Sequence, residues 1–328
     1  MKSTSGLFSG ILLRRRHVAA LVGMILAWTG ATGQARATEV IFVSNPAEFR
    51  IDRFALDGAS LGSIAVPNFG PYGLAVSSQG TLYASNQFNQ IVRFDSAGTP
   101  LDPNAGSPFI STGLASPYFL AVDSAGQIYA SNFGGNSVTV YNSSGALVRT
   151  VSNSVSQPYG IAVDGSGNLY VANYGSNTVK TYDNQGLLQS SFDLPFGTNP
   201  RGLAISSDNF LYVTNYYDHT ILKYDLAGTL ISTIAPDFLN DPTDLAFDSN
   251  GNLYAVNEGN STLSKYAAGS VHVPGFQPTG LSGPYGIAIG VPEPSTYVMA
   301  ILAGSVLGAC AVRRRRRGNS ANDLRVSK

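Results

Sequence analysis

The sequence predicts an all-β protein whose central part is a six-bladed β-propeller with four-stranded blades. The first observation behind this is a repeat, because a proline that precedes an alternating apolar segment recurs at Pro71, Pro117, Pro158, Pro200, Pro242 and Pro284. A period of about 40 to 50 residues in β-rich sequence is typical of propellers, with one blade per repeat. The second observation is that the two ends of the array are complementary fragments of one repeat.

The most regular unit, residues 158–188, shows how one blade is built. Its segments GIAV, LYVAN and TVKTYD alternate β-branched, aromatic and polar residues as strands do. Between them lie DGSGN and DNQG, which are rich in the residues that favour tight turns. No helix-period stretch interrupts the array, so every repeat is expected to be purely β.

The split repeat predicts how the ring closes. Residues 40–45 match the second strand of the unit, and residues 51–58 match its third strand and the following turn. Residues 284–290 match only the first strand. We therefore expect a sixth blade made of three N-terminal strands and one C-terminal strand within a propeller domain at 38–290, a closure that protects sheet edges.

The N-terminus, residues 1–37, has the features of a secretory signal. Arg14-Arg15-Arg16 precedes an apolar run at 18–28, and Ala35-Arg36-Ala37 fits a small-residue cleavage site. The alternative is a signal helix that stays as a membrane anchor, but the apolar run is too short to span a bilayer. The arginines do not complete a twin-arginine pattern, so export by Sec is expected.

The C-terminus has three parts: VPEPST at 291–296, an apolar run at 297–312, and five arginines ending at Arg317. This tail resembles the PEP-CTERM sorting signal of Gram-negative envelope proteins, with Pro292, Glu293 and Pro294 as the sorting motif. The resemblance implies export, membrane retention by a transmembrane helix at 297–312, and an exosortase-type sorting enzyme as partner. An ordinary tail anchor would explain the helix and the arginines but not the motif. The polar tail at 318–328 departs from the usual pattern.

Charge and cysteine content exclude several function classes. Residues 38–295 hold eight Lys or Arg against nineteen Asp or Glu, a net charge of −11. Such an acidic body disfavours binding to nucleic acid. The single cysteine, Cys310, lies in the apolar tail, so the body has no disulfide, thiolate metal site or cysteine nucleophile.

The repeat unit resembles the NHL-repeat family, whose pattern runs P-x-G-I-A-V-D, G-N-I-Y-V-A-D and F-D-x-x-G. The resemblance covers residues 40–290 and implies the blade type rather than a biochemical activity. One departure recurs, because the second strand ends in Asn where the family commonly has Asp. These residues are Asn45, Asn86, Asn132, Asn173, Asn215 and Asn257.

One face of the propeller gathers aromatic and amide side chains. Since successive strands alternate direction, the turn that enters strand one and the loop that leaves strand two share this face, which carries Tyr72, Tyr118, Tyr159, Tyr285 and the asparagines. In one interpretation each Asn caps a turn and each Tyr packs between blades. In the other, the rings and amides bind a glycan or peptide.

The repeat is broken on the same face in blades four to six. The tyrosine position becomes Arg201 in blade four, and the loops nearby carry Asp218, His219, Asp241, Asp244 and Glu258, with Glu48 and Arg50 in blade six. Arg201 and His219 join the candidate ligand-binding face. Asp241, Asp244 and Glu258 could supply oxygen ligands to a divalent cation such as calcium; the alternative is a solvated acidic rim.

These observations favour a non-catalytic, envelope-displayed propeller that binds an extracellular glycan, peptide or envelope protein, with no catalytic residue and no obligate cofactor. The alternative is a metal-dependent enzyme that resembles lactonase- or lyase-type propellers and uses the acidic patch. Only His219 and His272 remain in the body, too few for a three-histidine zinc site. An exopolysaccharide is one candidate glycan.

Overall fold

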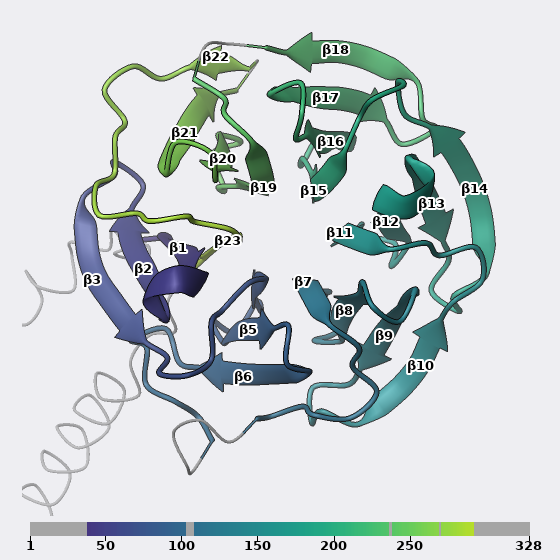
Figure 1. Cartoon of the computed structure of the whole chain (residues 1–328), viewed down its shortest axis with the longest axis horizontal. Helices are drawn as coiled ribbons and strands as arrows, with labels where there is room; N and C mark the ends of the chain where they lie inside the picture. Colours follow the sequence, from purple (N-terminus) through teal and green to yellow (C-terminus); the bar gives the residue numbers. More distant parts are fainter. Residues whose placement is uncertain (1–37, 103–107, 236–237, 269, 292–328) are drawn as a thin grey trace, which may run out of the picture. The chain divides into compact units, whose positions relative to one another are not determined.

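The central part of the chain is a ring of six β-sheets (Figure 1). The computed structural model describes residues 38–102, 108–235, 238–268 and 270–291. From Glu39 onward these residues belong to one compact unit. The predicted fold class and the number of blades are therefore confirmed.

Blades two, three and four are the regular ones, with four strands in sequence order from the centre of the ring outward. Blade two holds β7 (Pro117–Val122), β8 (Ile128–Asn132), β9 (Ser137–Tyr141) and β10 (Leu147–Val151). Blade three holds β11 (Pro158–Val163), β12 (Leu169–Asn173), the 3-10 helix η2 (Tyr174–Ser176), β13 (Thr178–Tyr182) and β14 (Leu188–Asp193). Blade four holds β15 (Pro200–Ile205), β16 (Phe210–Asn215), β17 (Thr220–Asp225) and β18 (Leu230–Ile234).

Blade six closes the ring in the way that the split repeat predicts. Its order is β23 (Ile287–Gly290), β1 (Val40–Asn45), β2 (Arg50–Ala55) and β3 (Ser60–Ala65), with the 3-10 helix η1 (Pro46–Glu48) after β1. The C-terminal strand β23 is antiparallel to β1, and Val43 lies opposite Ile287. The two ends of the array are thus hydrogen-bonded into one sheet.

Blades one and five are less regular at their outer edge. Blade one has three named strands, β4 (Leu74–Val76), β5 (Leu82–Asn86) and β6 (Gln90–Phe94). Beyond β6, only the isolated bridges Ile91–Ile110 and Phe94–Pro100 stand in for a fourth strand among the described residues. Blade five holds β19 (Pro242–Phe247), β20 (Leu253–Asn257), β21 (Thr262–Ala267) and a two-residue β22 (Val271–His272).

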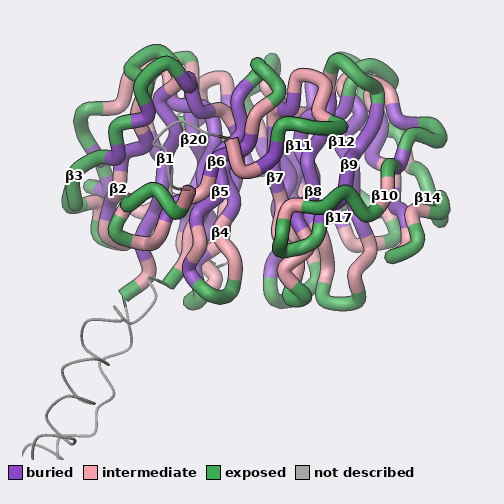
Figure 2. The backbone as a smooth tube through the Cα atoms, turned by 90° about the horizontal axis from the view of Figure 1, so that it is seen from below, coloured by how far each residue is buried: buried purple, intermediate pink, exposed green. Residues whose placement is uncertain are grey.

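The hydrophobic core lies in the middle strands and between neighbouring sheets. Every residue of β8, β12 and β20 is buried, whereas the outer strand β14 is almost wholly exposed. Figure 2 shows the buried strands inside the ring and the exposed turns at its two faces. This distribution follows from alternating apolar strands that pack on both sides.

Adjacent inner strands approach closely at the centre of the ring. A Cβ atom on Gly286 of blade six would lie 2.2 Å from the carbonyl oxygen of Tyr72 in blade one. A Cβ atom on Gly160 would lie 2.1 Å from the carbonyl oxygen of Arg201 in the next blade. The glycine of the Pro-Tyr-Gly motif therefore lets neighbouring blades meet, which also brings the residues before it together.

The predicted signal at 1–37, the sorting motif Pro292, Glu293 and Pro294, and the transmembrane helix at 297–312 lie outside the described residues. Within the described part of the chain, none of the helices is long and apolar enough to cross a membrane.

Candidate binding site at the mouth of the ring

Six residues occupy equivalent positions at the mouth of the ring, which we define as the face at which the inner strands begin. Each directly follows the proline of its repeat, so the same backbone position recurs in every blade. From blade one to blade six they are Tyr72, Tyr118, Tyr159, Arg201, Thr243 and Tyr285.

The four tyrosines form a continuous arc of touching rings. The ring centroids of Tyr285 and Tyr72 lie 4.8 Å apart, those of Tyr72 and Tyr118 lie 5.5 Å apart, and those of Tyr118 and Tyr159 lie 4.9 Å apart. Phe133 packs against the arc, with its ring centroid 5.1 Å from that of Tyr159 and 5.3 Å from that of Tyr118. Edge-on and tilted contacts of this kind are the favoured geometry for aromatic pairs.

Arg201 continues the arc on the blade-four side. Its guanidinium carbon lies 3.5 Å from the ring centroid of Tyr216 and 5.5 Å from that of Tyr159. Its Nη1 donates to Oε2 of Glu258 at 2.9 Å. Its Nε is buried and has no hydrogen-bond partner in the described part of the chain. The guanidinium is thus fixed by rings and by one carboxylate but keeps an unused donor.

The four tyrosines, Arg201 and Glu258 line a mouth cavity of about 540 Å³. The tyrosine arc, Arg201 and Glu258 form one part of its wall, and loop residues of blades six and one form the rest, including Phe49, Gln87 and Phe88. Arg201 and Glu258 are its only lysine, arginine, aspartate or glutamate side chains among the described residues. The two opposite charges leave the cavity close to neutral.

The hydroxyls of Tyr72, Tyr159 and Tyr285 act as neutral groups. Burial raises the pKa of Tyr72 and Tyr159, and it raises the pKa of Tyr285 well above its ordinary value. A phenol with a raised pKa stays protonated and can both donate and accept a hydrogen bond.

The recurring asparagines do not face the cavity. Asn45, Asn86, Asn132, Asn173 and Asn257 are fully buried, and Asn215 is 3% exposed. In blades two, three, five and six the side-chain oxygen accepts from a backbone N–H two residues before the proline of the same blade, at Ala115, Ser156, Asn240 and Ser282. The prediction that these asparagines lie on a ligand-binding face is therefore corrected. Their side-chain amides instead hold the loops that lead into the inner strands.

The structure does not bring the predicted metal ligands together. Asp244 is buried, and its two oxygens accept from the backbone N–H groups of Leu245 and Ile287 at 2.9 Å. Glu258 pairs with Arg201. No group of three or more His, Cys, Asp and Glu side chains in the described ranges could hold a metal ion.

His219 and Asp241 form a separate pair outside the cavity. Nδ1 of His219 accepts from the backbone N–H of Asp241 at 2.9 Å and lies 3.3 Å from its carboxylate. Both residues adopt the left-handed backbone region, with φ of 54° and 49°. This contact joins the loops of blades four and five and leaves His219 away from the cavity lining.

Serines that precede the asparagines are structural residues that the sequence reasoning missed. Oγ of Ser44 donates to the carbonyl oxygen of Tyr72, and Oγ of Ser85 donates to that of Tyr118. On the opposite side, Oγ1 of Thr243 donates to the carbonyl oxygen of Tyr285 at 2.7 Å. Ser44 and Ser85 lie on the second strand of their blade and Thr243 on an inner strand, and each bond ties one blade to the backbone of a mouth tyrosine in the next blade. The Ser-Asn pair that recurs at the end of the second strand is the sequence feature that could have identified them.

Comparison with protein families finds two short matches. Residues 198–224 match the NHL repeat, and residues 290–317 match the PEP-CTERM protein-sorting motif. The chain thus carries both features that the sequence predicts. The fold and the motif together indicate an exported protein sorted to the cell envelope of Gram-negative bacteria, and the motif implies recognition by exosortase.

Solved structures share the propeller fold at low sequence identity. A chain of a nidogen/laminin complex has a TM-score of 0.67 at 19% identity, covering 78% of this chain and 99% of its own length. A protein of unknown function from Bacteroides caccae has a TM-score of 0.60 at 15% identity, with 77% and 98% covered. Virginiamycin B lyase from Staphylococcus aureus has a TM-score of 0.55 at 17% identity, with 79% and 93% covered. The search of curated proteins found no match.

Proposed function

We propose that this protein is an envelope-displayed binding module and that its mouth cavity binds an uncharged part of an extracellular glycan. The observation that carries the proposal is the tyrosine arc that ends at the Arg201–Glu258 pair. Flat rings cover the apolar face of a sugar, and the few polar groups of the wall fix its orientation.

The Arg201–Glu258 pair offers complementary hydrogen-bonding partners side by side. Nη2 of Arg201, which makes no hydrogen bond in the described part of the chain, can donate to a sugar oxygen, and the carboxylate of Glu258 can accept from a neighbouring hydroxyl. A pair of adjacent hydroxyls presents both an acceptor and a donor. A net charge on the ligand is not needed, because the two side chains already balance one another.

The proposed location at the cell envelope follows from the two ends of the chain. During export by Sec the signal at 1–37 is cleaved off, and the apolar run at 297–312 holds the protein in the inner membrane until the sorting tail at 291–317 is processed. The protein is then displayed at the outer surface. A polysaccharide of the envelope is the ligand expected there. A metal-dependent lactonase or lyase is not proposed, because Asp241, Asp244 and Glu258 make separate interactions.

The test is binding of the exported protein to an array of neutral and acidic oligosaccharides. Tyr72 and Tyr118 are only half-buried, so Tyr72→Ala with Tyr118→Ala removes ring surface at modest cost to the fold. The double variant should lose binding to neutral glycans. Tyr217→Ala is the matched control, since Tyr217 is 62% exposed and lies outside the cavity lining. No binding by the wild type, or equal binding by the double variant, contradicts the proposal.

A further inference from the structure

The residue immediately before the third strand adopts the left-handed backbone region in all six blades. In five blades its side chain is polar, and φ lies between 48° and 64°, at Asn89, Asn136, Asn177, His219 and Ser261. In blade six this position is held by Phe49, with φ of 51°. Asparagine tolerates the left-handed region, whereas a bulky aromatic residue there is an outlier that costs stability.

The five polar side chains at this position tie each blade to the next one. Each forms a hydrogen bond with a backbone group of the loop that leads into the inner strand of the following blade. The pairs are Asn89 with Ser116, Asn136 with Gln157, Asn177 with Leu194, His219 with Asp241, and Ser261 with Gly283. Phe49 has no polar side-chain atom for such a bond, and its ring lies beside Gly70 of blade one, 3.9 Å from a Cβ built on that glycine. Phe49 therefore lacks both a favoured backbone conformation and a hydrogen bond between blades.

The ring of Phe49 lies at the edge of the mouth cavity instead. Its side chain is 48% exposed and lines the cavity, and so does Phe88 of the neighbouring blade one, which is 71% exposed. Exposed rings bury little apolar surface, so neither contributes much to folding. A strained residue that gives the fold so little is an indication of function at this edge of the cavity.

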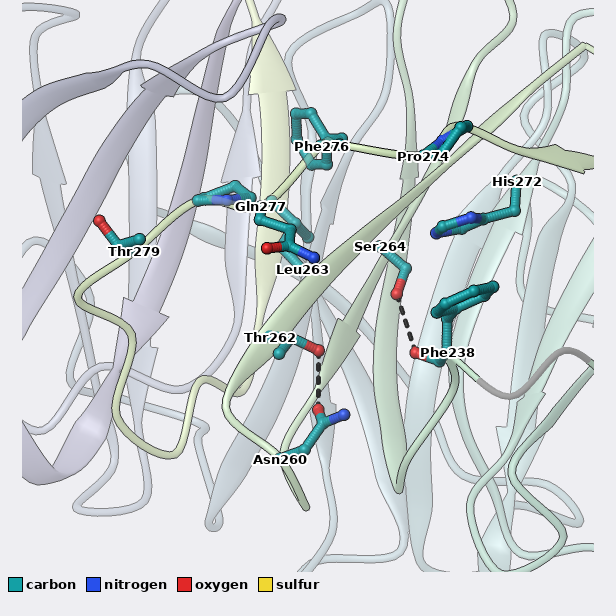
Figure 3. A pocket seen from close by; sticks show the side chains of 12 residues that line it. Phe238, Asn260, Thr262, Leu263, Ser264, His272, Pro274, Phe276, Gln277 and Thr279 are labelled. Carbon is teal, nitrogen blue, oxygen red and sulfur yellow. Dashed lines mark hydrogen bonds between the residues drawn. The ribbon is translucent and has the colours of Figure 1, made fainter.

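The aromatic residues that line the cleft at the outer edge of blade five are used differently (Figure 3). Phe276 is buried in the hydrophobic core between blades five and six. Phe238 is stacked on His272, with 3.9 Å between the ring centroids. These rings support the fold, whereas Phe49 and Phe88 keep ring surface exposed at the mouth cavity.

We infer that Phe49 and Phe88 form a second subsite of the mouth cavity, which holds a further sugar unit of a glycan chain. The inference rests on the proposed function, in which the first unit lies between the tyrosine arc and the Arg201–Glu258 pair. The charged pair comes from blades four and five and the phenylalanines come from blades six and one, so a chain that fills both subsites extends across the mouth. A phenyl ring has no hydrogen-bonding group, and it covers the apolar face of a sugar without fixing the hydroxyls. The ligand is therefore an oligosaccharide or polysaccharide chain rather than a single terminal sugar.

The test measures how affinity depends on chain length. Neutral oligomers of glucose, galactose, mannose and N-acetylglucosamine, from the monosaccharide to the hexasaccharide, are titrated into the exported protein by calorimetry. In at least one series the wild-type affinity should rise by about fivefold to tenfold once the chain reaches the phenylalanines. Phe49→Asn and Phe88→Ala should each remove this rise and leave the affinity for the shortest bound oligomer unchanged. Phe196→Ala is the matched control and should keep the rise, because Phe196 is fully exposed and lies outside the cavity lining.

Phe49→Asn also separates a role in binding from a role in folding. Asparagine suits the left-handed region and is the residue that blades one, two and three have at this position, so the urea midpoint of unfolding should stay the same or rise. A lower midpoint would assign Phe49 to the fold and overturn the inference.

The length series distinguishes this inference from the proposed function. If the wild type binds short and long oligomers equally, or if the rise persists in Phe49→Asn and Phe88→Ala, the second subsite is wrong while binding at the tyrosine arc stands. An equal loss of affinity at every length in the two variants also overturns it, since the rings would then belong to the first subsite. If the wild type binds no oligomer of any length, both the proposed function and the second subsite are wrong.

Discussion

The two sides of the mouth use the same backbone position for different purposes. On the side of blades six, one, two and three, tyrosines follow the proline and their rings line the cavity. On the side of blades four and five, Arg201 lines the cavity, but Thr243 and Asp244 are buried and bond to the backbone of blade six. A residue that departs from the repeat therefore either lines the cavity or forms a hydrogen bond between two blades. The burial of its side chain distinguishes the two cases.

The largest expected difference between the two sides is in pH dependence. Burial raises the pKa of Asp244 to about 8, against an ordinary value of 3.8. The unfolded chain loses this proton near pH 4 while the folded chain keeps it until about pH 8, so this group lowers the free energy of unfolding as the pH rises through that window. The slope is on the order of 1.4 kcal/mol per pH unit.

Asp244→Asn isolates that contribution. Urea unfolding between pH 5 and pH 8 (about three units of the window) should show a weaker dependence for the variant than for the wild type. Asp208→Asn, on an exposed turn, serves as control and should retain the wild-type slope. Equal slopes for Asp244→Asn and the wild type would contradict the assignment of the slope to this carboxyl.

The asparagines should act on stability and not on binding. Asn132→Ala removes an acceptor for the N–H of Ala115 and a donor to Thr139, both at 2.9 Å in a fully buried place. We expect a loss of about 2 to 3 kcal/mol in the free energy of unfolding, measured by denaturant titration. At denaturant concentrations below its unfolding midpoint, the variant should still bind glycan as the wild type does. A loss of binding in the folded variant would return the asparagines to the ligand-binding face.

Arg201 should show the reverse pattern, with the smallest effect on stability. Arg201→Met keeps much of the contact with Tyr216 but removes the donors, and Glu258 is partly exposed, so the cost to stability should stay within about 1 kcal/mol. Affinity for the strongest neutral glycan should fall by about tenfold or more in titration calorimetry. Arg53→Met on the outer rim is the control. Unchanged affinity in Arg201→Met would remove the guanidinium from the proposed site.

Periodicity explains why so much of the fold was predictable. The split repeat led directly to the β23–β1–β2–β3 sheet, because fragments that complete one repeat must pair to close the ring. The irregular edges were not predictable in the same way. In blade one the longer interval to Pro117 carries Pro100 and Pro108, which cannot donate to a ladder, and in blade five Pro274 and Gly275 turn the chain away.

The candidate site was predictable in part. Strand direction placed the tyrosines, Arg201 and Glu258 on one face, and the structure brings them together around one cavity. Strand direction predicts the face of the propeller on which a strand ends, but it does not predict whether a side chain there points to solvent or into the sheet. The asparagines and Asp244 were therefore assigned to the surface although they are buried. Loop residues such as Gln87 and Phe49 line the cavity but do not recur in the repeat, so the repeat pattern could not identify them.

The most direct test of the mouth cavity is the Arg201 Nε–H resonance, followed by NMR while the strongest neutral oligosaccharide from the array is added. This buried N–H belongs to the guanidinium that is proposed to donate to the sugar through Nη2, so its signal reports on binding at the guanidinium. Glycan binding should shift the Nε–H signal and slow its exchange with water, and it should also shift the ring resonances of Tyr118. An unchanged Arg201 signal at saturating glycan, with shifts confined to another face, would contradict it.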